Sequence, residues 1–196
     1  DDCTKLEISK TDIVTGEPVV GAQLSIIPLN ENGQPETDEI TASWVTTDKP
    51  HYIEYIPVGD YILRETIAPF ENGYVTAEDV KFTVKDTGVI QKVEMKDGRT
   101  KIEFLKVDMD TGKPLAKAQF ELYNEENVKV AEWVSTEESY RIEGLPVGDY
   151  ILKETKAPEG YSCLSEKETI EIKDTEEVQT FEIGNKKMSK VNPPVT

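Results

Sequence analysis

The sequence predicts an all-β protein that consists of two small antiparallel β-sandwiches in tandem, forming an elongated molecule. Three observations support this prediction. Short segments of alternating apolar and polar residues recur at close spacing, turn signals such as Asn32-Gly33 and Asn72-Gly73 separate them, and the whole pattern occurs twice. No window of 11 or more residues keeps the apolar stripe of an amphipathic helix.

The internal repeat divides the chain into domains. Residues 6–24 match 102–120, residues 42–45 match 131–134, and residues 56–69 match 145–158. The offset falls from 96 residues at the first match to 89 at the third, so the first copy carries about seven extra residues. We place them in an elongated loop at residues 30–40, which are rich in Asn, Gly and Pro. The predicted domains are 1–98 and 99–187, followed by a proline-rich tail at 188–196.

The first predicted strand, residues 5–10, ends in a lysine that lies in line with core residues. Residues two apart on a strand share a face, so Leu6, Ile8 and Lys10 point the same way. Two interpretations are open: a strand end whose amine reaches out to water, or an amine held at the edge of the core for chemistry. The arrangement returns at residues 101–106, which makes the lysine the starting point for a functional hypothesis.

A middle strand and the last strand of each copy also carry a polar residue in line with core residues. Each copy thus has a lysine, a glutamate and an Asp or Asn at matching positions. These residues are Lys10, Glu65 and Asp97 in the first copy and Lys106, Glu154 and Asn185 in the second. Unrelated strand ends facing solvent would explain any one of them. Buried charges are costly unless paired, and all three positions recur, so the pattern favours one shared site per domain.

The bulk composition excludes several classes of partner. The 196 residues carry a formal net charge of −17, which argues against binding to nucleic acid or to anionic lipid surfaces. No apolar run is long enough to span a membrane. No signal peptide is visible, and we expect a chain that opens Asp1-Asp2-Cys3 to be a fragment or a mature product.

The cysteines and the single histidine predict neither a disulfide framework nor a metal site. Cys3 and Cys163 fall in different repeats; we expect Cys163 on a strand or loop and leave Cys3 unassigned. His51, which we place in a loop specific to the first repeat, has no clustered partner, so we expect no metal, no cofactor and no hydrolase triad. The acidic turn 108–112 lacks the later ligands of a calcium loop.

The repeated motifs resemble a known family. Lys-x-Asp-x-x-Thr-Gly-x-Pro, then Pro-Val-Gly-Asp-Tyr-x-Leu-x-Glu-Thr-x-Ala-Pro, and a closing Asn are similar to the Cna B-type domain. This domain is also called the SpaA-type, prealbumin-like domain of Gram-positive surface adhesins and pilins, and its fold is an immunoglobulin-like sandwich. The resemblance covers nearly the whole chain, twice. It implies that a lysine of the first strand and an Asn or Asp of the last strand form a spontaneous isopeptide bond, promoted by the glutamate.

By position, the resemblance implies a bond from Lys10 to Asp97 promoted by Glu65, and one from Lys106 to Asn185 promoted by Glu154. The first domain departs from the commoner pattern because it ends in Asp. Desolvation would favour the neutral amine of the lysine, and a protonated glutamate could polarise the acceptor carbonyl and move a proton to the leaving group. Each domain would react once, so we expect autocatalytic maturation and no enzymatic turnover. The bond would tie the first strand to the last and carry tension between the termini.

The sequence therefore predicts a structural stalk of an adhesin or pilin, anchored in the wall outside a Gram-positive cell. Expected partners are neighbouring domains of the parent protein. Sortase and peptidoglycan are candidates because the tail, 191–196, resembles a Leu-Pro-x-Thr-Gly sorting motif with Pro193 in place of Leu; a plain proline linker is the alternative. The rival function is a ligand-binding module that recognises a host protein or glycan through residues 30–40. Trp44 and Trp133 recur at equivalent positions, so we expect them in the core.

Overall fold

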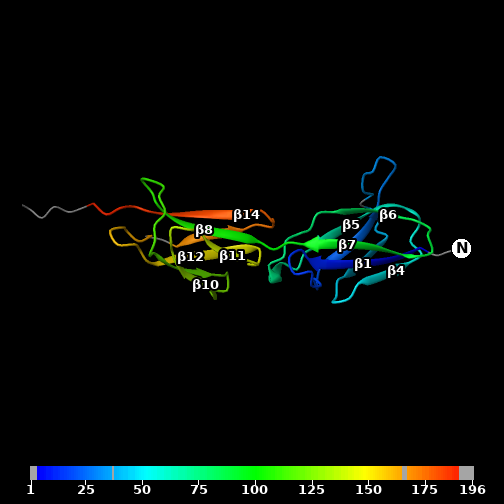
Figure 1. Ribbon diagram of the computed structural model, residues 1–196, viewed down its shortest axis with the longest axis horizontal. Coiled ribbons are helices and arrows are strands. Elements are labelled where there is room, and N and C mark those ends of the chain that lie inside the picture. Colours follow the sequence, from blue (N-terminus) through cyan, green and yellow to red (C-terminus); the bar gives the residue numbers. More distant parts are fainter. Residues whose placement is uncertain (1–3, 37, 165–166, 190–196) are drawn as a thin grey trace, which may run out of the picture. The chain divides into compact units, whose positions relative to one another are not determined.

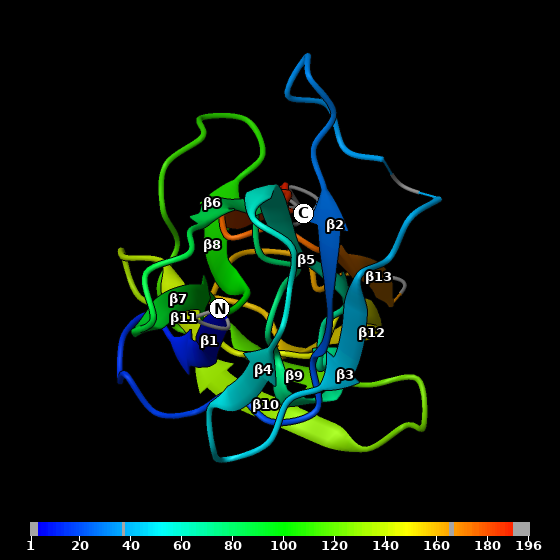
Figure 2. The ribbon, with the colours of Figure 1, turned by 90° about the vertical axis from the view of Figure 1, so that its right-hand side faces the viewer.

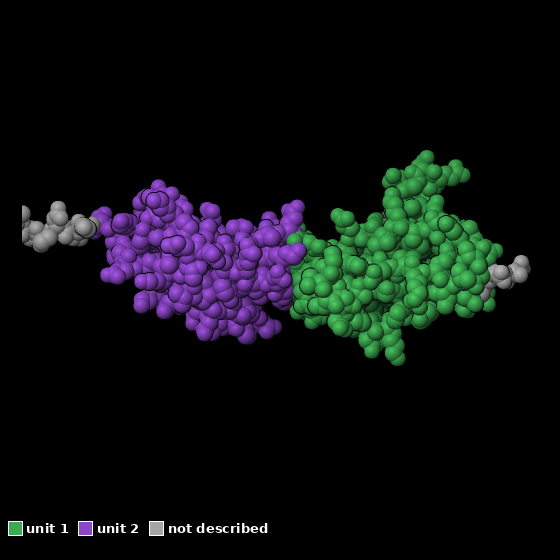
Figure 3. Space-filling model, viewed as in Figure 1, with its two compact units in different colours: residues 1–99, 174–176 green, residues 100–173, 177–196 purple. Residues whose placement is uncertain are grey.

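The computed structural model describes residues 4–36, 38–164 and 167–189. Within these residues it contains fourteen β-strands and one short 3-10 turn, Phe70–Asn72 (Figure 1). The chain forms two compact units, which Figure 3 shows in separate colours: Asp1–Arg99 with Asp174–Glu176, and Thr100–Lys173 with Glu177–Thr196. The all-β prediction is confirmed.

Each unit is a sandwich of a three-stranded and a four-stranded sheet. In the first unit the sheet orders are β4-β1-β7 and β3-β2-β5-β6. In the second unit they are β11-β8-β14 and β10-β9-β12-β13. The strands of the first unit are β1 Lys5–Asp12, β2 Gln23–Pro28, β3 Ala42–Val45, β4 His51–Glu54, β5 Gly59–Ile67, β6 Val80–Val84 and β7 Ile90–Asp97. Those of the second unit are β8 Lys101–Asp108, β9 Gln119–Tyr123, β10 Lys129–Val134, β11 Tyr140–Glu143, β12 Gly148–Lys156, β13 Glu168–Ile172 and β14 Val178–Asn185.

The first and last strands of each unit pair in parallel, within sheets whose other strand pairs are antiparallel. β1 and β7 run side by side from Lys5 opposite Ile90 to Asp12 opposite Asp97. β8 and β14 pair in the same way along their whole length. A parallel pair needs a long connection, and the strands between the two supply it by crossing to the other sheet and back. The start of β1 and the end of β7 therefore lie at opposite ends of the first unit.

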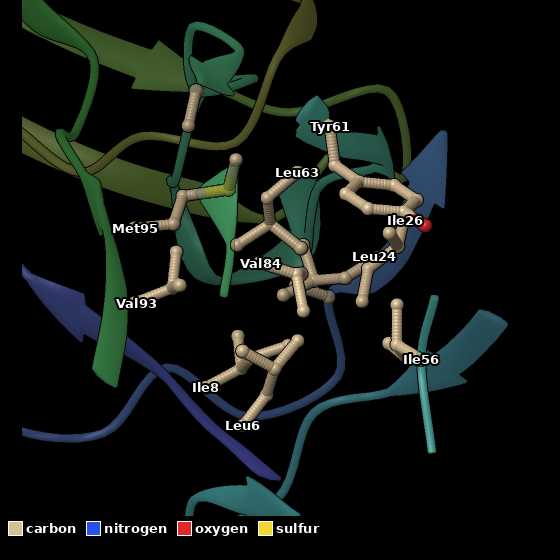
Figure 4. Close-up of a cluster of buried hydrophobic side chains, with 12 residues drawn as sticks. Leu6, Ile8, Leu24, Ile26, Ile56, Tyr61, Leu63, Val84, Val93 and Met95 are labelled. Atoms are coloured by element: carbon tan, nitrogen blue, oxygen red, sulfur yellow. The ribbon is translucent and has the colours of Figure 1, made fainter. Parts of the chain in front are cut away.

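The core of each unit lies between its two sheets. Strand alternation turns Leu6 and Ile8 of β1 toward Leu24 and Ile26 of β2, and Figure 4 shows these side chains pointing into one buried cluster. The corresponding cluster of the second unit contains Ile102, Phe104, Ala118, Phe120, Leu122, Trp133, Leu145, Tyr150, Leu152, Ile170, Ile172 and Ile183. Burial of such clusters supplies the main favourable term in folding.

The extra residues of the first copy lie between β2 and β3. Residues 29–41 connect these strands, whereas residues 124–128 connect their counterparts β9 and β10. Figure 2 shows the longer loop extending away from the strands of its own unit. His51 corrects a prediction: it lies on β4 and not in a loop specific to the first repeat, and its counterpart is Tyr140 at the start of β11. The extra residues of the first copy come before β3, so the strand that carries His51, β4, has a counterpart in the second copy, β11.

The two tryptophans differ in their surroundings. Trp133 is 8% exposed and packs against the rings of Phe104, Phe120 and Tyr140 at centroid distances of 5.0, 5.2 and 4.6 Å. Trp44 is only partly buried. Its ring stacks on that of His51 at a centroid distance of 4.3 Å. The smaller Ile8 and Leu24 take the places of Phe104 and Phe120 here, and together with Trp44 they line an open cavity of about 170 Å³. The expected core position is confirmed for Trp133, while Trp44 lies at the edge of the core.

Trp133→Ala is therefore expected to be much more damaging than Trp44→Ala. Removing the enclosed Trp133 ring should lower the free energy of unfolding of the second unit by about 3–5 kcal/mol. The ring of Trp44 already faces open space, so its loss should cost the first unit less than about 2 kcal/mol. Differential scanning calorimetry of the whole chain measures both, with Val134→Ala, which truncates an exposed side chain, as the control. Equal losses in the two units would contradict this account.

Candidate functional site

The structure brings the three predicted residues of the first unit together. Lys10 Nζ donates a hydrogen bond to Asp97 Oδ1 and lies 3.1 Å from Glu65 Oε1. All three side chains are fully buried. Lys10 lies on β1 and Asp97 at the end of the neighbouring β7, whereas Glu65 reaches the pair from β5 of the other sheet. The site therefore joins both layers of the sandwich.

The second unit repeats this arrangement. Lys106 Nζ donates to Asn185 Oδ1 at 2.5 Å and lies 3.3 Å from Glu154 Oε1. Asn185 Nδ2 donates to the same Glu154 oxygen at 2.7 Å. Phe120 covers the amine, with its ring centroid 5.5 Å from Lys106 Nζ. Each of the three polar side chains thus contacts the other two.

Burial disfavours the charged form of two of these groups, Asp97 and Lys106. It raises the pKa of the Asp97 carboxyl to about 7, although the hydrogen bond from Lys10 acts in the opposite direction. It also lowers the pKa of the Lys106 amine, against the opposing attraction of Glu154. A neutral amine is a nucleophile and an ammonium is not, so desolvation favours the reactive form of Lys106.

Two oxygens of the first site lack a hydrogen-bond donor among the described residues. They are Glu65 Oε1 and Asp97 Oδ2, both buried. In the second site the matching gap is filled, because Asn185 donates to Glu154 there. An unpaired buried oxygen is costly. The raised pKa of Asp97 favours its protonated form, in which one of its oxygens carries a proton and no longer needs a donor.

The arrangement of each site is suited to forming an amide between two side chains. The amine lies in hydrogen-bond contact with the carboxyl or carboxamide group that it would attack, and a glutamate oxygen lies close to the amine. Fixed neighbouring groups of this kind supply the proximity that the same step lacks in water. The glutamate is placed to accept a proton from the amine and to pass it to the leaving group.

Sequence reasoning missed the groups that hold the glutamates. Ala77 N–H donates to Glu65 Oε2 and Leu164 N–H donates to Glu154 Oε2, both at 2.7 Å. A backbone donor leaves no signal in the residue type. Sequence reasoning also missed the buried Asp12, which is 3% exposed. The sequence does carry a signal for this residue, because an aspartate follows each site lysine by two positions.

The remaining predicted features occupy ordinary positions. Asp108 Oδ1 accepts the backbone N–H groups of Asp110 and Thr111, so it caps its own turn. Cys163 is exposed, and its thiol contacts the Glu154 carbonyl oxygen. Within residues 4–36, 38–164 and 167–189, no group of His, Cys, Asp and Glu is arranged to hold a metal ion. No helix of this part of the chain could cross a membrane. Cys3 and the predicted sorting motif fall outside the described residues.

Comparisons with known proteins agree with this architecture. The model of the SpaA family, described as a prealbumin-like fold domain, matches the chain twice, over residues 4–99 and 100–187. No curated protein sequence matches the chain. Among solved structures, the Bacillus anthracis TIE protein is 32% identical, with a TM-score of 0.57 over 95% of this chain. This chain spans only 35% of the length of that protein.

Two solved pilins are more distant. A streptococcal ancillary pilin is 21% identical, with a TM-score of 0.45, and the match covers 96% of this chain and 63% of the pilin. A minor pilin of Streptococcus agalactiae is 20% identical, with a TM-score of 0.43, and the match covers 98% of this chain and 100% of the pilin.

Proposed function

This chain belongs to the family of SpaA prealbumin-like fold domains, and we propose that it is a load-bearing stalk of a Gram-positive surface adhesin or pilin whose two units each carry a self-generated isopeptide bond. The family consists of structural proteins and not of enzymes. The observation that carries the proposal is the buried Lys–Glu–Asp or Lys–Glu–Asn set, which occurs once in each unit and links its first and last strands.

In the second unit, the reaction joins Lys106 Nζ to the Asn185 side-chain carbon. The neutral amine attacks that carbon, a C–N bond forms, and the C–Nδ2 bond breaks. Glu154, which contacts both groups, takes a proton from the amine and gives one to the leaving nitrogen. The products are an amide and one molecule of ammonia. Loss of ammonia to solvent makes the step effectively irreversible.

In the first unit, the same attack by Lys10 on Asp97 expels water. The hydroxyl of the protonated Asp97 carboxyl leaves together with a proton that Glu65 relays from the amine. This step needs the proton that burial retains on the site at neutral pH. The Asp acceptor is therefore compatible with the reaction because its environment keeps the carboxyl from ionising fully.

The parallel pairing of first and last strands gives the bond a mechanical role. Tension applied to the two ends of the first unit would shear β1 against β7. Lys10 and Asp97 are 87 residues apart along the chain. A bond between them would pass that tension directly from one strand to the other, and the residues between them would carry no load. The second bond would close a span of 79 residues. On the loop-entropy model, each closure stabilises its unit by roughly 4–5 kcal/mol.

The two bonds should differ in their dependence on pH. The reactive pair in the first unit, a neutral Lys10 amine beside a protonated Asp97, holds the same number of protons as an ammonium beside a carboxylate. Because the pKa of Asp97 is about 7, the rate of water loss should rise about tenfold per pH unit up to this value and level off above it. Ammonia loss at Asn185 needs only the neutral amine, so its rate should level off at the pKa of Lys106, which burial lowers, and not at that of Asp97. Mass spectrometry of freshly translated chain, quenched at timed intervals between pH 6 and 9, measures both rates. Parallel pH profiles for the two units would contradict the assignment.

The rival proposal, a ligand-binding module, is favoured by the loop between β2 and β3. This loop borders an open cleft of about 520 Å³ lined by Leu29, Asn30, Glu31, Gly33, Asp60, Lys81, Phe82 and Thr83. Surface plasmon resonance against a panel of extracellular-matrix proteins tests it. Saturable binding that disappears when residues 30–40 are shortened to the length of the second copy would favour the binding module over a pure stalk. Within the stalk proposal, the partners are neighbouring domains of the parent protein, with sortase and peptidoglycan at the wall.

A further inference from the structure

One loop in each unit contacts the site glutamate and also the chain next to the lysine and next to the acceptor. We call it the strap; it covers residues 68–77 after β5 and residues 157–164 after β12. Each strap donates a backbone N–H group to its glutamate, through Ala77 in the first unit and Leu164 in the second. Each also pairs with the chain just beyond the acceptor residue. These last contacts run from Val75 N to Gly98 O at 3.2 Å and from Ser162 N to Lys186 O at 3.0 Å.

A tyrosine–aspartate hydrogen bond ties the first strap to the lysine strand. Tyr74 O–H donates to Asp12 Oδ2 at 3.0 Å. Asp12 is the last residue of β1, two positions beyond Lys10, and is buried. Its other oxygen, Oδ1, accepts the backbone N–H groups of Val14 and Thr15 at 2.8 and 3.0 Å. The carboxylate is therefore fixed in place, and so is the strap that bonds to it.

The second unit contains the same tie. Tyr161 O–H donates to Asp108 Oδ2 at 2.7 Å. Asp108 follows Lys106 by two positions at the end of β8 and caps its turn through Oδ1. The two ties lie in equivalent places, and in both units the aspartate belongs to the repeated Lys-x-Asp motif that carries the site lysine.

We propose that the pairs Tyr74–Asp12 and Tyr161–Asp108 are positioning residues for isopeptide formation, an inference that rests on the proposed function. The lysine and its acceptor share one sheet, but the glutamate comes from the other, and the strap connects the two. Without the tie, the strap and the glutamate that it holds can shift relative to the amine. Proton transfer needs hydrogen-bond distance, and a displacement of about 1 Å can cost up to about a hundredfold in rate.

The first unit reinforces its tie with a charge. Arg99 Nε donates to Asp12 Oδ2 at 2.9 Å, and its Nη2 donates to the Tyr74 hydroxyl oxygen at 2.8 Å. Lys187 occupies the corresponding place beside Tyr161 in the second unit. Loss of the tyrosine hydroxyl should therefore slow the second unit more than the first, because Arg99 still holds Asp12 in Tyr74→Phe.

Tyr161→Phe tests the proposal because it removes one hydroxyl and keeps the ring. The full chain is translated in a cell-free system, quenched in acidic denaturant at timed intervals, and analysed for ammonia loss at Asn185. We expect this rate to fall at least about fivefold at a temperature where the second unit is fully folded, with water loss at Asp97 unchanged. Tyr123→Phe is the matched control: it removes the hydroxyl that donates to Glu121, a residue of the outer surface.

Two aspartate variants separate positioning from simple stability. Asp108→Asn can still hydrogen-bond Tyr161, so it should react faster than Asp108→Ala even where both are folded. Ammonia loss at the unmodified rate in Tyr161→Phe, or equal rates in the two aspartate variants, would overturn the positioning role. If the unmodified chain itself loses neither ammonia nor water, the proposed function fails; a normal rate there with no effect of the variants overturns only this inference.

Discussion

Glu154→Ala is expected to leave the second unit without its cross-link while the first unit still forms its own. The carboxylate of Glu154 contacts both Lys106 and Asn185, so its removal takes away the group that we propose to move the proton between them. The mass should then show the loss of one water and no ammonia. The free energy of unfolding of the second unit should fall by roughly 4–5 kcal/mol, the entropic value of the lost closure. Intact-protein mass spectrometry and calorimetry measure the two effects.

Two variants control for this experiment. Glu171→Ala removes an exposed glutamate of β13, outside the strap, so it should retain both mass losses and the stability of the unmodified chain. Glu65→Ala should give the mirror result, with ammonia lost and water retained. Ammonia loss that continues at full extent in Glu154→Ala would remove the glutamate from the mechanism.

Lys106→Ala is expected to convert the second unit from inextensible to extensible under force. Without the bond, tension shears β8 from β14 and unfolds the unit, which frees the span of 79 residues between Lys106 and Asn185. At about 3.5 Å per residue, single-molecule pulling should show a new extension step of about 280 Å at most. The unmodified chain should show no step of this length, because the proposed bond would carry the load past those residues.

The first unit serves as the internal reference in the same pulling trace. Its Lys10 and Asp97 are untouched in Lys106→Ala, so it should remain locked, while Lys10→Ala should unlock it instead. A 280 Å step of equal frequency in the unmodified chain would mean that the second unit carries no covalent bond between its first and last strands.

Strand periodicity explains why so much of the fold and the site could be predicted. The side chains of a strand alternate between its faces, so the row Leu6, Ile8 and Lys10 turned inward together, and the structure places the lysine in contact with Asp97 and Glu65. The repeat then provided a second, independent example of each position.

The features that sequence reasoning missed depend on contacts between distant segments. The direction of β7 beside β1 follows from the path of five intervening strands, which no local pattern records. The hold on Glu65 comes from the backbone N–H group of Ala77, which every residue type except proline would supply. The prediction for His51 is wrong because the extra residues of the first copy all precede β3, so the connection that leads into β4 has the same length as its counterpart before β11.

Intact-protein mass spectrometry of the unmodified chain tests the central claim most directly. Formation of both bonds removes one ammonia, from Asn185, and one water, from Asp97. We therefore expect a mass below that of the sequence by one ammonia plus one water, and a cross-linked peptide pair from each unit after proteolysis. A mass equal to that of the sequence would contradict the proposal for both units.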